Sequence, residues 1–204
     1  MCPKNAKPRI FQHSFTKSYS EVISLLVTFC TFVGIIKRQL NNNKKYKILF
    51  VCLGNICRSP AAQAVMQRLV DEHGLTDQFV IDSAGISSYH CGDLPDRRMR
   101  VHARPRGYEL THRSRPVERA DFEEFDLIIA MDAANASDLR EMAANPDEVL
   151  KIELIGPYIH HPHYDYVPDP YYEGSEGFEL VLDLLEEACN NLLDKLIEKT
   201  NNTK

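Results

Sequence analysis

The 204-residue chain lacks the features that define several classes of protein. It has no internal repeat, and its longest apolar run, residues 22–36, is shorter than the roughly 20 residues that cross a bilayer comfortably. Cys52 and Cys57 lie close together, but no second cysteine pair follows them, so structural zinc is not expected. The tract His160–His163 is interpreted as part of a solvated loop. With 44% hydrophobic and 26% charged residues, the composition excludes a disordered, collagen-like or polytopic membrane protein.

The main body of the chain also lacks an excess of positive charge. Residues 1–45 carry a net charge of +7, whereas residues 46–204 carry −12. Nucleic-acid binding rests on the neutralisation of phosphates by basic side chains, so no nucleic-acid partner is expected for this acidic body. Any anion that it binds must be met by a local arrangement of donors.

Disulfide bonds are not needed in a chain of this length. The six cysteines are spread along the sequence, and a chain that can bury a substantial core does not depend on cross-links for its stability. A reducing compartment, the cytoplasm, is therefore expected. Under those conditions a cysteine can work as a free thiol.

Residues 1–45 form a basic N-terminal extension for which three interpretations stay open. Its apolar run, 22–36, is flanked by lysine and arginine but lacks the small residues of a signal-peptide cleavage site. The extension is a dispensable flank translated from a start placed too early, a membrane-associating helix, or a helix packed on the domain.

Residues 46–199 alternate between strand and helix patterns, and residues 200–204 form a short tail. The pattern predicts an α/β fold with a doubly wound, four-stranded parallel sheet flanked by helices, and a ligand site at the carboxyl ends of the strands. The arginines of residues 97–106 are interpreted mostly as a solvated helix face. The predicted strands cover 47–51, 79–81, 127–131 and 152–155, the predicted helices cover 60–73, 97–106, 133–143 and 177–199, and a loop covers 156–174.

The loop from Cys52 to Pro60, after the first strand, has the composition of an anion site. Its successive N–H groups can point inward at the start of a helix, where the partial charge is positive. Gly54 permits a tight turn, Asn55 tolerates a positive φ, and Pro60 suits the first helical position. Because the loop lacks the lysine of a nucleotide-binding P-loop, nucleotide binding is not expected.

The two ends of this loop carry reactive side chains. Arg58 can clamp two phosphate oxygens with its planar guanidinium group. Cys52, next to that arginine and to the helix end, is expected to ionise to a thiolate. A thiolate below a bound phosphoryl group is an in-line nucleophile. The predicted phosphate-binding residues are Leu53, Gly54, Asn55, Ile56, Cys57, Arg58 and Ser59.

Two segments of the sequence resemble the low-molecular-weight protein tyrosine phosphatases. Residues 51–60, Val-Cys-Leu-Gly-Asn-Ile-Cys-Arg-Ser-Pro, resemble the active-site loop of this family, and residues 169–172, Asp-Pro-Tyr-Tyr, resemble its acid loop. The likeness covers residues 45–199 and implies hydrolysis of protein phosphotyrosine through a phosphocysteine intermediate. By position it implies these roles: Cys52 as nucleophile, Arg58 as phosphate clamp and Asp169 as general acid and base.

The same resemblance implies a supporting network and a class of partner. Ser59 would donate a hydrogen bond to the thiolate, and Asn55, Ser83 and His112 would help to hold the loop open. Met131-Asp132 also matches the family pattern. The expected partners are tyrosine-phosphorylated proteins, for which an autophosphorylating tyrosine kinase is one candidate, and no cofactor is expected.

The acid loop also has a physical rationale. The phenol of tyrosine has a pKa of about 10, so its departure needs a proton donor such as Asp169. Tyr171 and Tyr172, together with Ile56, can form a wall against a phenyl ring. Arg58 and the N–H groups supply the stabilisation of charge, so no metal is needed.

Three other functions are less consistent with these residues. Related arsenate reductases need two further cysteines at a spacing that Cys91 and Cys189 do not have. Related arginine phosphatases carry a threonine where Ile56 stands, and a branched apolar residue favours an aromatic ring over a guanidinium group. A non-catalytic phosphotyrosine-binding module needs neither the thiol of Cys52 nor the carboxyl of Asp169.

Cys57, inside the loop, has two possible roles. One is that of a small apolar filler facing the sheet. The other, which the resemblance suggests, is to trap oxidised Cys52 as a reversible disulfide. Tyr89 is assigned no role.

Overall fold

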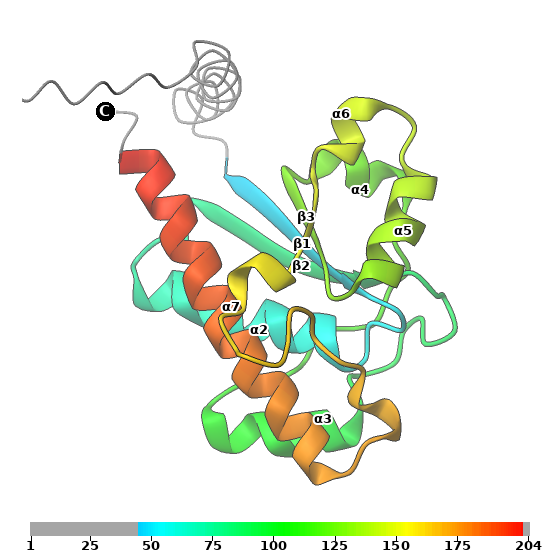
Figure 1. The fold of residues 1–204 in the computed structure, drawn as a ribbon, viewed down its shortest axis with the longest axis vertical. Coiled ribbons are helices and arrows are strands. Elements are labelled where there is room, and N and C mark those ends of the chain that lie inside the picture. The colour runs from blue at the N-terminus through cyan, green and yellow to red at the C-terminus, as the bar shows by residue number, and fades with distance from the viewer. Residues whose placement is uncertain (1–44, 202–204) are drawn as a thin grey trace, which may run out of the picture. The chain divides into compact units, whose positions relative to one another are not determined.

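The computed structural model describes residues 45–201, so the expectations for residues 1–44 and 202–204 lie outside the described residues. A four-stranded parallel sheet with strand order β2-β1-β3-β4 lies between helices on its two faces (Figure 1). The predicted doubly wound α/β fold is therefore confirmed. The strands are β1 (Tyr46–Cys52), β2 (Phe79–Gly85), β3 (Leu127–Ala130) and β4 (Ile152–Leu154).

The inner strand β1 is buried on both of its faces. Because successive side chains of a strand point to opposite faces, Ile48 and Phe50 pack into one core cluster, whereas Leu49 and Val51 pack into another. All four side chains are fully buried. A parallel strand covered on both faces has a continuous apolar sequence, which is the pattern that predicted it.

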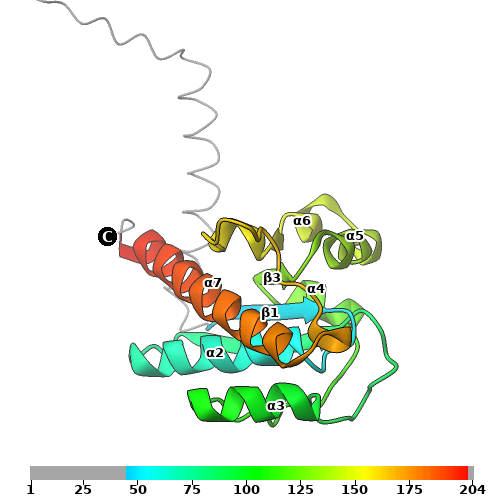
Figure 2. The same ribbon diagram turned by 60° about the horizontal axis from the view of Figure 1, so that its bottom comes forward.

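Two sets of helices cover the sheet (Figure 2). The first set is α2 (Arg58–Glu72), α3 (Arg97–Ala103) and α7 (Ser175–Asn201), and the second is α4 (Arg119–Glu124), α5 (Ala133–Met142) and α6 (Pro146–Val149). Buried side chains of the first set belong to the same core cluster as Ile48 and Phe50. Those of α4 and α5 belong to the cluster of Leu49 and Val51, and α6 lies beside α5 in both views.

The predicted boundaries of two helices need correction. Helix α2 begins at Arg58, so Pro60 is its third residue and not its first. The single helix predicted over residues 97–106 is α3 followed by a separate 3₁₀ turn (Arg104–Arg106), which ends at Gly107 with φ +86°. A glycine reaches this left-handed conformation at no steric cost, so it stops the helix.

The two short helices α4 and α6 were not predicted from the sequence. Each depends on capping side chains and not on an apolar repeat. The carboxylate of Asp121 accepts a hydrogen bond from the N–H of Glu118, and the amide oxygen of Asn145 accepts one from the N–H of Glu148. Such short helices leave no periodic signal.

Arg106 differs from the solvated arginine face that the sequence predicts for residues 97–106, because it binds to α7. The guanidinium of Arg106 donates to the carboxylates of Asp183 (2.7 Å) and Glu186 (3.1 Å) on α7 and also pairs with Glu179. This arginine therefore joins the turn after α3 to α7.

Among residues 45–201, no helix combines the length and the apolar character that crossing a bilayer requires.

The loop after β1 lies at a topological switch point. The strands β2 and β3 flank β1 on opposite sides, so the connections leaving their carboxyl ends diverge there. Cys52 is the last residue of β1 and pairs with Gly85 at the end of β2. The fold therefore opens a ligand site where the cysteine loop begins.

Candidate active site

The backbone of the loop between β1 and α2 turns its carbonyl oxygens outward. Because C=O and N–H point in opposite directions across a trans peptide, the N–H groups that follow these carbonyls point inward. Four donors outside the loop hold the carbonyls at 2.7–3.1 Å: the N–H groups of Ile86, Ser87 and Asp96 bond to the carbonyls of Cys52, Leu53 and Ile56, and the Ser114 hydroxyl bonds to that of Gly54.

Asn55 fixes the shape of the loop. Its φ is +53°, in the left-handed region, and its side chain is fully buried. Its amide nitrogen donates to the hydroxyls of Ser59 (2.8 Å) and Ser83 (2.9 Å). Its amide oxygen accepts from Nε2 of His112 (3.0 Å) and from the N–H of Arg115 (3.0 Å). All the hydrogen-bonding capacity of the amide is used, which compensates for the backbone conformation.

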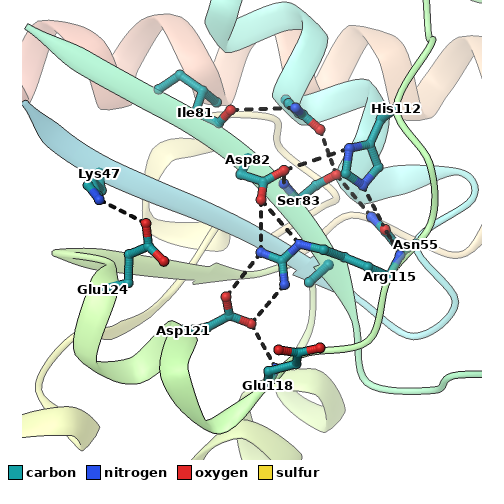
Figure 3. Close-up of polar contacts among 12 residues, drawn as sticks. Lys47, Asn55, Ile81, Asp82, Ser83, His112, Arg115, Glu118, Asp121 and Glu124 are labelled. Carbon is teal, nitrogen blue, oxygen red and sulfur yellow. Dashed lines mark hydrogen bonds and ion pairs between the residues drawn. The ribbon is translucent and has the colours of Figure 1, made fainter. Parts of the chain in front are cut away.

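The segment that carries His112 and Arg115 is itself anchored (Figure 3). The guanidinium of Arg115 donates to Asp82 on β2 (2.8 Å) and to Asp121 on α4 (2.9 Å). Burial opposes its charge, but the bonds to the two carboxylates outweigh that effect and hold the pKa of Arg115 above its usual value. Burial lowers the pKa of His112, although the Asp82 carboxylate at 3.7 Å opposes the shift.

The sulfur of Cys52 lies at the floor of this loop, with 3% of the residue exposed. It is 3.3 Å from the inward N–H of Asn55 and 3.1 Å from the hydroxyl of Ser59. That hydroxyl also lies 3.2 Å from the carbonyl of Ala84, and it accepts a bond from Asn55, so its single proton is available to the sulfur or to that carbonyl. Both donors can stabilise negative charge on the sulfur.

Arg58 faces this floor and is 3% exposed. Its guanidinium donates to the carboxylates of Asp132 (2.6 Å) and Asp169 (2.8 Å) and to the carbonyl of Val167 (3.3 Å). Burial opposes the charge of Arg58, but Cys52 and the two carboxylates outweigh burial and raise its pKa. Asp132 also caps α5, so the helix aims its carboxylate at the arginine.

Asp169 reaches the site from the segment that precedes α7. It precedes the 3₁₀ turn Pro170–Tyr172, and its carboxylate accepts a hydrogen bond from the N–H of Tyr171 (3.1 Å) as well as from Arg58. The side chain is 42% exposed. The fold thus brings the carboxyl group of Asp169 to the loop that carries both the thiol of Cys52 and the guanidinium of Arg58.

A cavity of about 300 Å³ lies above the loop. Ile56, Tyr171 and Tyr172 line it, as predicted for a wall against an aromatic ring. Its lining also includes three residues that the sequence analysis missed, Ser87, Tyr89 and His90. They follow β2 in a segment without a recognisable motif. Only the pairing of β2 with β1 brings that segment to the mouth of the cavity.

Cys57 is almost fully buried, although it also contributes to the lining of the cavity. It belongs to the hydrophobic core cluster, and burial raises the pKa of its thiol far above the usual value. Both Cys52 and Cys57 are free thiols.

Among residues 45–201, no three metal-ligating side chains lie close enough together to hold an ion.

The fold and this arrangement define a cysteine-dependent phosphatase, in which an anion-binding loop holds a thiol between a guanidinium group and a carboxyl group. The family model described as low molecular weight phosphotyrosine protein phosphatase matches residues 47–202. The chain belongs to this family, so the resemblance of the two motifs is confirmed.

Relatives in several organisms are similar over most of their length. A putative low molecular weight protein-tyrosine-phosphatase of Synechocystis sp. is 50% identical over 150 residues, 74% of this chain and 96% of the relative. The crystal structure of a protein tyrosine phosphatase from Entamoeba histolytica has a TM-score of 0.74 at 46% identity, and the match covers 76% of this chain and 99% of that chain. The crystal structure of a Drosophila arginine phosphatase has a TM-score of 0.69 at 36% identity, covering 74% and 97%.

Proposed function

We propose that this phosphatase hydrolyses phosphotyrosine in proteins through a phosphocysteine intermediate on Cys52. The observation that carries the proposal is the placement of the Cys52 sulfur against inward N–H groups and opposite the buried guanidinium of Arg58. Family membership and the names of the relatives support phosphotyrosine as the substrate. The assay that tests it compares phosphotyrosine, phosphoserine and phosphoarginine peptides with the full chain, and turnover of phosphoserine at the same rate as phosphotyrosine would contradict it.

The first step moves the phosphoryl group from oxygen to sulfur. The Cys52 thiolate attacks phosphorus, the P–S bond forms as the P–O bond breaks, and the electron pair stays on the phenolic oxygen. The loop N–H groups and Arg58 hold the three remaining phosphate oxygens, whose charge grows in the transition state. The N–H of Asn55 (3.3 Å) and the hydroxyl of Ser59 (3.1 Å) lie next to the sulfur that attacks.

Asp169 supplies the proton for the departing phenolate. Its carboxyl group pairs with the guanidinium of Arg58 at 2.8 Å. A substrate phosphate that binds Arg58 competes for the same guanidinium and leaves the carboxyl group of Asp169 free to donate to the phenolic oxygen. In the second step, water attacks phosphorus and Asp169, now without its proton, accepts one from the water. The new P–O bond forms as the P–S bond breaks, the electron pair returns to the sulfur of Cys52, and phosphate leaves.

The shape of the cavity favours a long, flat substrate side chain. The sulfur lies at the floor, and half of the surface of Leu53 and nearly all of Tyr172 (94%) is exposed at the mouth. A phenyl ring can therefore reach between Ile56 and Tyr171 while the peptide backbone stays outside. The shorter phosphoserine side chain brings the peptide backbone against these residues before its phosphate reaches the loop.

Replacing Ile56 with threonine tests the choice between tyrosine and arginine. The apolar side chain lines the cavity, and a hydroxyl there adds a partner for a guanidinium group. The ratio of kcat/KM for phosphoarginine to that for phosphotyrosine is expected to rise about tenfold in Ile56→Thr. The control is Ile56→Val, which shortens the side chain without adding a hydroxyl. Equal ratios in both variants would show that this position does not set specificity.

We also propose redox control through Cys57. Peroxide oxidises the Cys52 thiolate to a sulfenic acid, and the Cys57 thiol displaces its hydroxyl as water to form a disulfide. Wild-type activity lost to mild peroxide is expected to return fully with dithiothreitol. In Cys57→Ser, recovery is expected to be incomplete, because Cys52 is oxidised further to irreversible acids. Cys91→Ser, which changes an exposed cysteine, is the control. Full recovery in Cys57→Ser would leave Cys57 with a packing role alone.

The cellular setting follows from the same chemistry. A working thiolate suits a reducing compartment, and the cysteines within residues 45–201 are free, which supports a cytoplasmic location. The partners that we propose are tyrosine-phosphorylated proteins, for which an autophosphorylating tyrosine kinase is one candidate. Membrane association through residues 22–36 stays one of three open interpretations of the N-terminal extension. Cell fractionation tests the location, and recovery of a disulfide-bonded, secreted chain would contradict it.

A further inference from the structure

A side chain outside the cavity links the two loops that carry the reacting groups. Arg98 lies in the first turn of α3, between the cysteine loop and the turn that carries Asp169. We infer that Arg98 is a positioning residue, which holds the acid turn in register with the phosphate-binding loop so that Asp169 meets the leaving oxygen. This inference rests on the proposed function.

One end of the link is fixed to the cysteine loop. The N–H of Asp96 donates to the carbonyl of Ile56 at 2.7 Å. The carboxylate of Asp96 in turn accepts bonds from the N–H of Arg98 (2.7 Å) and from its Nε (3.1 Å) and Nη2 (2.9 Å). One backbone bond and two bonds from the guanidinium, all to the same carboxylate, hold the arginine side chain in a single orientation relative to the loop.

The other end is fixed to the acid turn. Nη1 of Arg98 donates to the carbonyl of Tyr171 at 2.9 Å, and the N–H of that same tyrosine donates to the Asp169 carboxylate at 3.1 Å. The guanidinium also lies over the rings of Tyr171 (5.2 Å) and Phe178 (4.9 Å). The guanidinium of Arg98 therefore contacts both the turn that follows Asp169, through Tyr171, and α7, through Phe178.

The role of this link is geometric. The side chain of Arg98 is 46% exposed, and an ion pair at such a surface contributes little to stability. A planar guanidinium with partners at each nitrogen is nevertheless a stiff spacer. Because a proton donor must lie within hydrogen-bond reach of the leaving oxygen, a misplacement of about 1 Å can cost up to about 100-fold in rate.

The expected signature is a rate loss that depends on the leaving group. An aryl phosphate with an acidic phenol departs without help, whereas a basic phenolate needs the proton of Asp169. Removing Arg98 is therefore expected to leave kcat/KM for acidic phenols nearly unchanged and to lower it about tenfold for the most basic ones. A fault in folding alone would lower kcat/KM equally across the series.

The test measures kcat/KM of the full chain across aryl phosphates of increasing phenol pKa. The proteins are wild type, Arg98→Ala, Arg98→Lys and Asp169→Ala, with Arg104→Ala as the matched control, since Arg104 is an exposed arginine whose ion pair is with Glu109 (3.2 Å). Arg98→Ala is expected to give a steeper decline with phenol pKa than wild type. The decline for Arg98→Lys is expected to lie between those of wild type and Arg98→Ala, because an ammonium group cannot bond to both Asp96 and Tyr171 as the guanidinium does. The series of Arg104→Ala is expected to parallel that of wild type.

Two results would overturn the inference: an Arg98→Ala series parallel to wild type, or a loss of the same size for every leaving group. Thermal unfolding of each variant, measured beside the kinetics, identifies a loss of folded protein as the cause of a uniform effect. Failure of the proposed function gives a different outcome. Either wild type hydrolyses no aryl phosphate, or the decline of kcat/KM with phenol pKa is the same in Asp169→Ala as in wild type.

Discussion

The variant Cys52→Ser is expected to lose turnover of phosphotyrosine peptides, by at least about 10⁴-fold, while it still binds phosphate or vanadate. The hydroxyl is not ionised near neutral pH and is a far poorer nucleophile than a thiolate. The inward N–H groups and Arg58 do not depend on the sulfur, since the outward carbonyls are held by Ile86, Ser87 and Asp96. Catalysis and anion binding therefore separate in this variant.

Cys91→Ser is the control for this substitution. Cys91 is exposed and lies outside the loop, so its variant is expected to turn over at the wild-type rate. Steady-state kinetics and phosphate-protection titrations measure the two properties. Turnover of Cys52→Ser above background would remove Cys52 from the role of nucleophile. If Cys52→Ser loses anion binding as well as turnover, the loop depends on the sulfur for its shape.

The variant Asp169→Ala is expected to lose about 10²–10⁴-fold in kcat/KM for phosphotyrosine. Without the carboxyl group the departing phenolate carries its own charge, so the rate falls steeply as phenol pKa rises. In wild type the proton cancels that charge as it forms, and leaving-group basicity hardly matters. Because kcat/KM reports the first chemical step, the steeper slope isolates the acid role from the later base role.

The control for the acid is Asp165→Ala, which removes an exposed aspartate from the same loop. Its series of aryl phosphates is expected to parallel that of wild type. Parallel slopes for Asp169→Ala would mean that another group donates the proton. The ion pair between Asp169 and Arg58 would then serve only to hold the loop.

The elements that the sequence predicted well are those whose signals are local. The run 47–51 is apolar because β1 is covered on both faces, and the loop after it carries its chemistry in consecutive residues. Cys52, Arg58 and Asn55 could therefore be assigned from neighbours in the sequence. Asp169 could be assigned because its own segment carries a second motif.

The residues that the sequence did not predict are those brought to the site by tertiary contacts. Tyr89 reaches the cavity only because β2 pairs with β1. Asp132 matched the pattern, but its bond to Arg58 depends on the way α5 is capped. Arg98 was interpreted as part of a solvated helix face and Arg115 was assigned no role, yet each bridges segments far apart in the chain. No periodicity or spacing records such partners.

Direct detection of the phosphocysteine tests the central claim. Asp169→Ala is mixed with an aryl phosphate of low phenol pKa, so that formation of the intermediate needs no acid while its hydrolysis lacks a base. The reaction is quenched rapidly, and the digested protein is analysed by mass spectrometry. A phosphoryl group on Cys52 is expected to accumulate in Asp169→Ala and to be absent from Cys52→Ser. Turnover without phosphorylated Cys52, or with the phosphoryl group on another residue, would contradict it.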